Sequence, residues 1–230
     1  MMRLAVTENV NKLPKAILFD WDNTLVDTWP VIHDAMNVTL KYMGCDGWDM
    51  VETRKRVRRA LRETFPELFG TRWQEARDVF YERFHKIHLE RLEIIDGAQE
   101  LIKLLAKSPI YVAVVSNKNG ENLRREAEYL GWSNYFDVMV GAADAAKDKP
   151  AMEPVLMALE GSGFAPGKEV WFIGDTEIDV QCANNSGCTS ILISNGTDYL
   201  IQDSDMMPDI KIPNLIYLRG LVLKDGNSIL

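Results

Sequence analysis

The sequence predicts an α/β fold with a doubly wound parallel sheet and a separate helical region. Apolar runs of strand length alternate with helix-patterned segments through most of the chain, an order typical of a parallel sheet with helices on its faces. Residues 30–93 interrupt this order with charge-rich, helix-patterned sequence. A chain of 230 residues with 47% hydrophobic content can also bury a full core of this type.

The first part of the chain contains one predicted strand and three predicted helices. The run Ala-Ile-Leu-Phe at 16–19 has the length and composition of a buried strand. In the region that follows, apolar residues recur at helical spacing, which predicts helices near 31–42, 57–61 and 73–92. The aromatic residues of the third helix, Trp73, Phe80 and Phe84, are expected in the core of this region.

Beyond residue 93 the alternation of strands and helices is regular. Helices are expected at 97–107, 121–130, 151–162 and 178–186. Strands are expected at 110–115, 137–140, 170–173 and 189–193. The stretch 195–213 indicates a polar loop, and the apolar run Leu215 to Leu218 predicts an edge strand.

Two aspartates directly follow the first predicted strand, in the run Asp20-Trp21-Asp22-Asn23-Thr24. In open α/β sheets, ligands bind beyond the carboxyl ends of the strands, so chemistry is expected in this loop. Two nearby carboxylates can divide the work, because a metal ion keeps one ionised while the other carries a proton. An aspartate that attacks phosphorus gives an aspartyl-phosphate, and Mg²⁺ on the same carboxylate neutralises phosphate charge. A plain turn with capping acidic residues is the alternative.

Polar groups follow other predicted strands as well. They form three short runs: Ser116-Asn117-Lys118, Lys149-Pro150, and Gly174-Asp175 with Asp179 four residues later. Ser116 and Asn117 are small donors that can hold a phosphate. Four segments of the chain thus offer polar groups to one site.

These four segments resemble, in order and spacing, the four motifs of the haloacid dehalogenase-like (HAD) hydrolase superfamily, over roughly residues 16 to 195. The resemblance implies a Rossmann-like core domain of residues 1–29 and 94–230. Residues 30–93 lie between the first and second motifs, where the superfamily's helical-cap (C1) type carries its lid. Phosphoglycolate-phosphatase-like members are the branch that the chain resembles most.

The resemblance implies a role for each residue of the first motif. Asp20 corresponds to the nucleophile and a magnesium ligand. Asp22 corresponds to a general acid/base that also offers its backbone carbonyl to the metal. Thr24, grouped with the substrate-binding residues, would support the loop. Mg²⁺ prefers oxygen ligands, so carboxylates, a carbonyl and waters make a suitable shell.

The later motifs imply the remaining site residues. Ser116 and Asn117 would hold the phosphoryl group. Lys149 would pair with the nucleophile and with the phosphate oxygens, where its charge stabilises the shift of bonding. Asp175 would complete the magnesium ligands, and Asp179, counted with the metal site, would orient a metal-bound water or Lys149.

Asp22 also indicates the reaction type within the superfamily. Dehalogenases, phosphonate-cleaving members and P-type ATPases have other residues at this place, whereas phosphatases and phosphomutases have Asp, since a leaving alkoxide needs a proton. We therefore expect a Mg²⁺-dependent phosphomonoester hydrolase that acts on a small phosphorylated metabolite through an aspartyl-phosphate. A sugar phosphomutase and a catalytically silent binding protein are the alternatives. Asn23 stands where many members have Gly, and Lys147 is an alternative to Lys149.

Charge and composition limit the partners. The net charge of −8 argues against nucleic acid, but it leaves an anionic substrate possible because the field in a cleft depends on local residues and bound metal. Cys45, Cys182 and Cys188 have no metal-type spacing and are expected to be structural. No apolar run approaches the roughly 18 residues that span a membrane, and a reducing cytoplasm is the expected setting. The sequence carries no signal for the oligomeric state.

The expected cap contains one basic run, Arg54 to Arg62. It could meet a second anionic group of a substrate. The alternative is a solvated helix face balanced by neighbouring glutamates.

Overall fold

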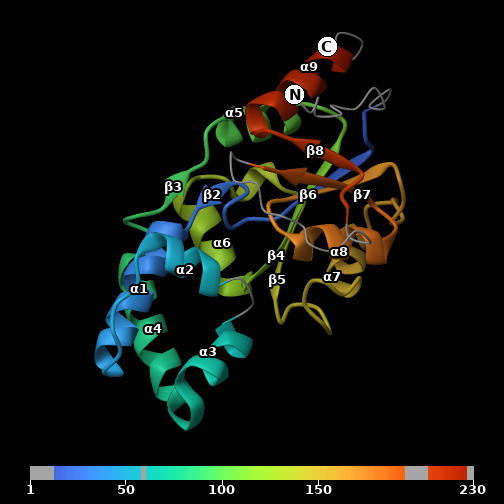
Figure 1. The fold of residues 1–230 in the computed structure, drawn as a ribbon. Coiled ribbons are helices and arrows are strands. Elements are labelled where there is room, and N and C mark those ends of the chain that lie inside the picture. Colours follow the sequence, from blue (N-terminus) through green and yellow to red (C-terminus); the bar gives the residue numbers. More distant parts are fainter. Residues whose placement is uncertain (1–12, 58–60, 195–206, 227–230) are drawn as a thin grey trace, which may run out of the picture. The chain divides into compact units, whose positions relative to one another are not determined.

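The computed structural model describes residues 13–57, 61–194 and 207–226 (Figure 1). The chain divides into two compact units, one made of residues 1–26 and 94–230 and the other of residues 27–93. The chain passes between them through two short strands, β2 (Val26–Asp27) and β3 (Glu93–Ile94), which form a two-stranded sheet. Each unit has its own buried core.

The larger unit is built on a six-stranded parallel sheet with the order β5-β4-β1-β6-β7-β8. The strands are β1 (Ala16–Phe19), β4 (Tyr111–Asn119), β5 (Val138–Ala142), β6 (Val170–Gly174), β7 (Thr189–Ile193) and β8 (Ile210–Ile212). After β1 the chain adds β4 and β5 on one side, then crosses to add β6, β7 and β8 on the other. The carboxyl end of β1 is therefore a topological switch point, where ligands bind in folds of this kind.

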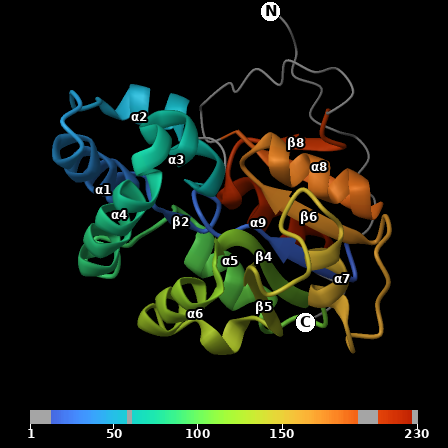
Figure 2. The same ribbon diagram turned by 90° about the horizontal axis from the view of Figure 1, so that it is seen from below.

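Helices cover both faces of this sheet. They are α5 (Ala98–Leu105), α6 (Gly120–Tyr129), α7 (Glu153–Leu159), α8 (Glu177–Ser186) and α9 (Leu215–Gly226). Figures 1 and 2 show α7 and α8 on one face, with α5 and α9 on the opposite face. Leu18 packs with Val155 and Ala183 in the core on the α7–α8 side. Burial on both faces explains why the strands are almost wholly apolar.

The predicted fold class is confirmed, and several of the predicted elements differ. The strand expected at 110–115 continues as β4 to Asn119. The edge strand predicted from Leu215 is wrong, because this run begins helix α9, where the Asn214 side chain accepts a hydrogen bond from the Tyr217 backbone N–H at 2.9 Å. A four-residue apolar run does not distinguish strand from helix.

The edge strand is instead β8, within the stretch predicted as a polar loop. Residues 195–206 of that stretch lie outside the described residues. None of the helices in the described segments combines the length and the apolar character needed to cross a lipid bilayer.

The smaller unit is helical, as expected. Its elements are α1 (Trp29–Tyr42), α2 (Met50–Arg56), α3 (Leu61–Phe69), the 3₁₀ turn η1 (Gly70–Arg72) and α4 (Trp73–Ile87). Phe80 and Phe84 are buried against Met36 and Phe65, as predicted for the aromatic positions of α4. The helix expected near 57–61 falls mostly on residues 58–60, which lie outside the described residues; α2 ends at Arg56 and α3 begins at Leu61.

The basic run of this unit is only partly described. The Arg54 guanidinium lies over the Trp29 ring, 5.6 Å from its centroid, and Arg56 pairs with Glu52 one turn earlier. Residues 58–60 and the side chain of Arg62 lie outside the described part of the chain. The described arginines are thus engaged within their own unit.

Asp34 joins α1 to the C-terminal part of this unit. Its carboxylate accepts two hydrogen bonds from Arg83, from Nε at 2.5 Å and from Nη2 at 3.1 Å, and one from Arg91 Nη1 at 2.7 Å. The Asp34 side chain is 21% exposed. The hydrogen bond and charge of Arg83, with those of Arg91, hold the pKa of Asp34 below its usual value of 3.8. Such bidentate pairs are stronger than ordinary surface ion pairs.

Replacing Asp34 with Asn is expected to lower the free energy of unfolding by about 1 kcal/mol at neutral pH. The pKa of Asp34 is lower in the folded than in the unfolded state. Its stabilisation of the folded state is therefore present above about pH 4 and is lost as pH falls through the folded-state pKa. Urea denaturation at neutral and acidic pH measures this difference. Asp78→Asn is the control, since Asp78 is 68% exposed and pairs with its neighbour Arg77. Equal losses of unfolding free energy in the two variants would contradict a stabilising role of the Asp34 ion pairs.

Candidate active site

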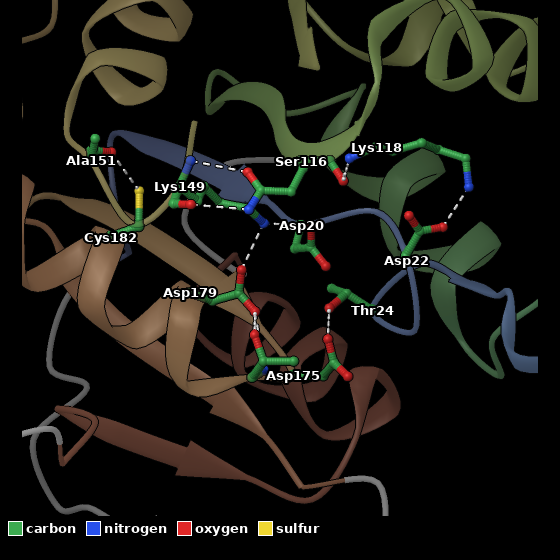
Figure 3. A network of polar contacts seen from close by, with 12 residues as sticks. Asp20, Asp22, Thr24, Ser116, Lys118, Lys149, Ala151, Asp175, Asp179 and Cys182 are labelled. Carbon is green, nitrogen blue, oxygen red and sulfur yellow. Dashed lines mark hydrogen bonds and ion pairs between the residues drawn. The ribbon is translucent and has the colours of Figure 1, made fainter. Parts of the chain in front are cut away.

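Polar side chains from three neighbouring strands meet at the carboxyl edge of the large sheet (Figure 3). Asp20 directly follows β1, Asp175 directly follows β6, and Ser116 lies in the last part of β4. The Asp20 backbone N–H donates to the Ile173 carbonyl at 2.8 Å, which extends the β1–β6 ladder to the site. The parallel sheet thus brings together residues that are far apart in the sequence.

Lys149 joins two of the aspartates. Its Nζ atom lies 2.6 Å from Asp20 Oδ1 and 2.7 Å from Asp179 Oδ1, and its side chain is 4% exposed. Lys147, the alternative considered from the sequence, is 71% exposed and pairs with Glu153. Lys149 is therefore the lysine that the structure brings to the predicted nucleophile.

The Asn117 side chain fastens the loop that carries this lysine. Its Oδ1 accepts a hydrogen bond from the Lys149 backbone N–H at 3.0 Å, and its Nδ2 donates to the Lys149 carbonyl at 3.0 Å. The amide is thus used to position Lys149, and its predicted contact with a phosphoryl group stays a prediction. Ser116 is buried beside it, and its hydroxyl oxygen accepts the Lys118 backbone N–H at 3.2 Å.

Asp179 is fixed by the first turn of α8. One carboxylate oxygen faces Lys149, while the other accepts the Thr176 backbone N–H at 3.0 Å and the Thr176 hydroxyl at 2.7 Å. This is a capping box, which satisfies a free donor at the start of the helix. Gly174 allows the close approach, because a Cβ atom there would lie 2.2 Å from Asp179 Cγ.

Three carboxylates form a compact cluster at the centre of the site. Asp20, Asp175 and Asp179 are all buried, and they offer oxygens that lie within 4.8 Å of one another. Thr24 is buried next to them and its hydroxyl donates to Asp175 Oδ1 at 3.3 Å. Within the part of the chain that the structure describes, Lys149 is the cation in contact with this cluster.

The cluster holds more carboxyl groups than ammonium groups. Burial raises the pKa of Asp20 to about 7, and Asp179 and Asp22 add to this effect, while Lys149 opposes it. Burial also raises the pKa of Asp175, with the charges of Asp179 and Asp20 adding to it. Burial alone would lower the pKa of Lys149, but the attraction of Asp179 and Asp20 outweighs it and the net pKa is raised.

A divalent cation fits this donor set. When all three buried carboxyl groups are ionised they outnumber the one ammonium group, and a doubly charged ion would neutralise the excess negative charge. The donors are all oxygen atoms, which hard cations prefer. No imidazole or thiolate stands among the three ligand candidates.

The structure also bears on Asn23 and on the three cysteines singled out in the sequence. Asn23 has a φ of 61°, in the left-handed region where Asn is among the few tolerated non-glycine residues. This accounts for Asn where many members of the superfamily have Gly. Cys182 and Cys188 are buried as expected, whereas Cys45 is exposed. Burial raises the pKa of the Cys182 thiol to about 12, which favours the neutral thiol over the reactive thiolate.

Sequence reasoning missed two charged residues of the site, Lys118 and Glu126. Lys118 Nζ lies 2.6 Å from Asp22 Oδ1 and 3.0 Å from Glu126 Oε2. Burial alone would lower the pKa of Lys118, but Asp22 and Glu126 outweigh it and the net pKa is raised. Lys118 belongs to the polar run Ser116-Asn117-Lys118 after a predicted strand, which is a signal that could have identified it. Glu126 has no such signal, because its sequence context is that of a solvent-exposed helix residue.

Replacing Gly174 with Ala is expected to displace Asp179 and weaken binding of a divalent cation by about tenfold or more, with a loss of about 1–3 kcal/mol in stability from overpacking. Calorimetric titration with Mn²⁺ and urea denaturation measure the two effects. Gly167→Ala is the matched control, since a Cβ atom at Gly167 would meet nothing within 4 Å. Unchanged Mn²⁺ affinity in the Gly174 variant would show that Asp179 does not shape the cation site.

Comparisons with known proteins agree with this geometry. The family model for haloacid dehalogenase-like hydrolases matches residues 17–193. The chain is 26% identical over 221 residues to the phosphoglycolate phosphatase of Chromobacterium violaceum, covering 92% of this chain and 97% of that protein. It is 30% identical over 182 residues to the phosphoglycolate phosphatase of Aquifex aeolicus, covering 77% of this chain and 84% of that protein.

Solved structures give the same result. A HAD-superfamily hydrolase from Ehrlichia chaffeensis is 32% identical, with a TM-score of 0.64, covering 93% of this chain and 98% of that one. The haloacid dehalogenase-like protein SP0104 from Streptococcus pneumoniae shares the fold, with a TM-score of 0.80 at 22% identity, covering 90% and 97% of the two chains. The family model matches residues 17–193, which is most of this chain, and the four motifs gather at one edge of the sheet. This chain therefore belongs to the haloacid dehalogenase-like hydrolase family.

Proposed function

We propose that this protein is a Mg²⁺-dependent phosphomonoester hydrolase that forms an aspartyl-phosphate on Asp20. The observation that carries the proposal is the position of Asp20, at the end of the central strand, 2.6 Å from the Lys149 ammonium and within the cluster formed with Asp175 and Asp179. Membership of the hydrolase family and similarity to proteins named phosphoglycolate phosphatase support it.

The first half of the reaction transfers the phosphoryl group to the protein. The Asp20 carboxylate attacks phosphorus while the bond from phosphorus to the ester oxygen breaks. Asp22 gives a proton to that oxygen, so that an alcohol leaves rather than an alkoxide. The Lys149 ammonium, with the Ser116 hydroxyl, stabilises the charge on the phosphoryl oxygens.

The second half releases inorganic phosphate. A water molecule attacks the phosphorus of the aspartyl-phosphate, and Asp22, now ionised, takes the proton from that water. The bond between phosphorus and the Asp20 oxygen breaks, which restores both carboxyl groups. Asp22 therefore acts in both steps, first as an acid and then as a base.

Asp20, Asp175 and Asp179, together with the backbone carbonyl of Asp22, would hold the magnesium ion. When bound, Mg²⁺ would keep the carboxylates ionised and neutralise charge on the phosphoryl oxygens. The substrate class is a small phosphorylated metabolite. A phosphatase is favoured over a mutase because no described feature of this chain is specific to a mutase, and phosphate release separates the two.

A phosphate-release assay with and without Mg²⁺ tests the proposal. The panel contains phosphoglycolate, sugar phosphates, nucleotides, phosphoamino acids and pyrophosphate. We expect Mg²⁺-dependent release of inorganic phosphate from at least one phosphomonoester. Interconversion of sugar phosphates without phosphate release would identify a mutase instead, and absence of both activities would contradict the proposal.

Asp20→Asn is expected to reduce turnover by at least about a thousandfold, because the amide is a poor nucleophile. Circular dichroism should be unchanged, since the amide has the same shape. Trapping with radiolabelled substrate and peptide mapping should find phosphate on Asp20 in the wild type. Substantial activity of the variant on p-nitrophenyl phosphate with Mg²⁺ would refute the role of Asp20.

Lys149→Met is expected to lower kcat/KM by about a hundredfold or more, because the charge that stabilises the phosphoryl oxygens is lost. Lys147→Met, two residues away, is the matched control. Its side chain is 71% exposed and pairs with Glu153, so its kcat/KM should stay within about twofold. Steady-state kinetics on the best substrate of the panel measure both. A larger loss in the Lys147 variant would reverse the assignment of the lysine.

A further inference from the structure

A second buried ion-pair network lies beside the acidic cluster, and of its members only Asp22 has a part in the reaction described so far. Lys118 Nζ contacts Asp22 Oδ1 at 2.6 Å and Glu126 Oε2 at 3.0 Å. The same Glu126 oxygen accepts a hydrogen bond from Trp21 Nε1 at 2.8 Å. Four residues from the β1 loop, β4 and α6 are thus joined in a chain that ends on Asp22.

The inner end of this chain is rigid. Glu126 is fully buried, and the Lys118 side chain is 6% exposed. The Trp21 ring is fully buried and packs edge-on against Trp132 and Phe136, with centroids 5.8 and 6.2 Å away. Only Asp22, whose side chain is 27% exposed, reaches toward solvent. The network therefore connects a fixed core to one accessible carboxylate.

Stability does not explain this network. Removing a lysine and a glutamate from water costs several kcal/mol per ion, and apolar side chains of similar size are often equally or more stabilising. A buried ion pair with an accessible end is better explained by what it does to that end. Perturbed ionisable groups of this kind gather at functional sites.

Charge argues against a role for Lys118 in binding an anionic part of the substrate. The ammonium already faces two carboxyl groups, so the group of Lys118, Asp22 and Glu126 has no excess positive charge, and it is negative when both carboxyl groups are ionised. A second phosphate or carboxylate placed there would be repelled rather than attracted. The remaining possibility is that Lys118 acts on Asp22.

We propose that Lys118 is a positioning residue for the general acid/base Asp22. Lys118 holds Oδ1, and none of the other side chains that the structure describes hydrogen-bonds to the Asp22 carboxylate. Oδ2 is therefore the oxygen that this arrangement leaves for proton transfer. Figure 3 shows the Asp22 carboxylate turned toward Lys118, on the opposite side of Asp20 from Lys149 and Asp179. Glu126 and Trp21 hold Lys118 in place from the core.

Position matters because proton transfer needs hydrogen-bond reach to the ester oxygen, and an error of about 1 Å can cost about a hundredfold in rate. Asp22 lies in a loop, where its side chain would otherwise sample several rotamers. This inference rests on the proposed function, in which Asp22 protonates the leaving group.

A double-mutant cycle tests the inference. The variants are Lys118→Met, Asp22→Asn and the two combined, assayed on an alkyl phosphate and on p-nitrophenyl phosphate. For the alkyl phosphate, Lys118→Met should lower kcat by about ten- to a hundredfold with KM within about threefold. The pre-steady-state burst of p-nitrophenolate should change less than about threefold, since this leaving group needs no proton.

The combined variant gives the decisive result. If Lys118 acts through Asp22, Lys118→Met should cause no further loss in the Asp22→Asn background. Additive losses, or a raised KM with unchanged kcat, would overturn the inference. A wild-type protein without phosphatase activity would contradict the proposed function itself. An active wild type in which the losses of the two single variants add up would contradict only the role of Lys118.

Two further variants guard against a purely structural effect. Trp21→Phe removes the hydrogen bond to Glu126 and should reproduce the leaving-group pattern with a smaller loss, of about three- to tenfold. It serves as the second test where Lys118→Met does not fold. Lys168→Met is the matched control, because the Lys168 side chain is 66% exposed and pairs with Asp209. Its kinetics should match those of the wild type.

Discussion

The central place of β1 in the parallel sheet is the constraint on which the site depends. Hydrogen bonding to β4 and β6 aligns Phe19 with Val114 on one side and with Ile173 on the other. The residues just beyond these paired positions, Asp20, Ser116 and Asp175, therefore lie at the same edge of the sheet, where their side chains meet. A register slip of one residue would turn Asp20 to the opposite face of the sheet. The register of the sheet thus determines where the site residues lie, and the loops only refine their positions.

The same edge of the sheet concentrates buried charge in two neighbouring groups. Lys149 lies among the carboxylates of the cation cluster, and Lys118 lies between Asp22 and Glu126. Each group holds more carboxylates than ammonium ions, so neither is the arrangement that would make the fold most stable. Proteins accept such costs at functional sites, where perturbed charges are needed for binding and proton transfer. The apolar layers on both faces of the sheet supply the stability that the site lacks.

Much of the core could be predicted from the sequence, because each strand is a short apolar run followed by polar residues. That pattern is local, so Asp20, Ser116 and Asp175 could be assigned to strand ends without coordinates. Glu126 could not, since its partner Trp21 lies 105 residues away in the sequence and only folding brings the two together.

The errors of the sequence analysis have equally local causes. The run from Leu215 has no period of its own, and its helical state depends on the capping side chain of Asn214. Asn117 is not among these errors, because its expected contact with a phosphoryl group, inferred from a small polar residue after a strand, stays a prediction. Its bonds to the Lys149 backbone depend on a loop thirty residues later, which no local pattern contains. The paired strands β2 and β3 bring the two ends of the helical insertion together. Because the helical insertion leaves and rejoins the core through two paired strands, its ends are neighbours, so evolution can exchange or enlarge it as a module while the sheet and its chemistry stay intact.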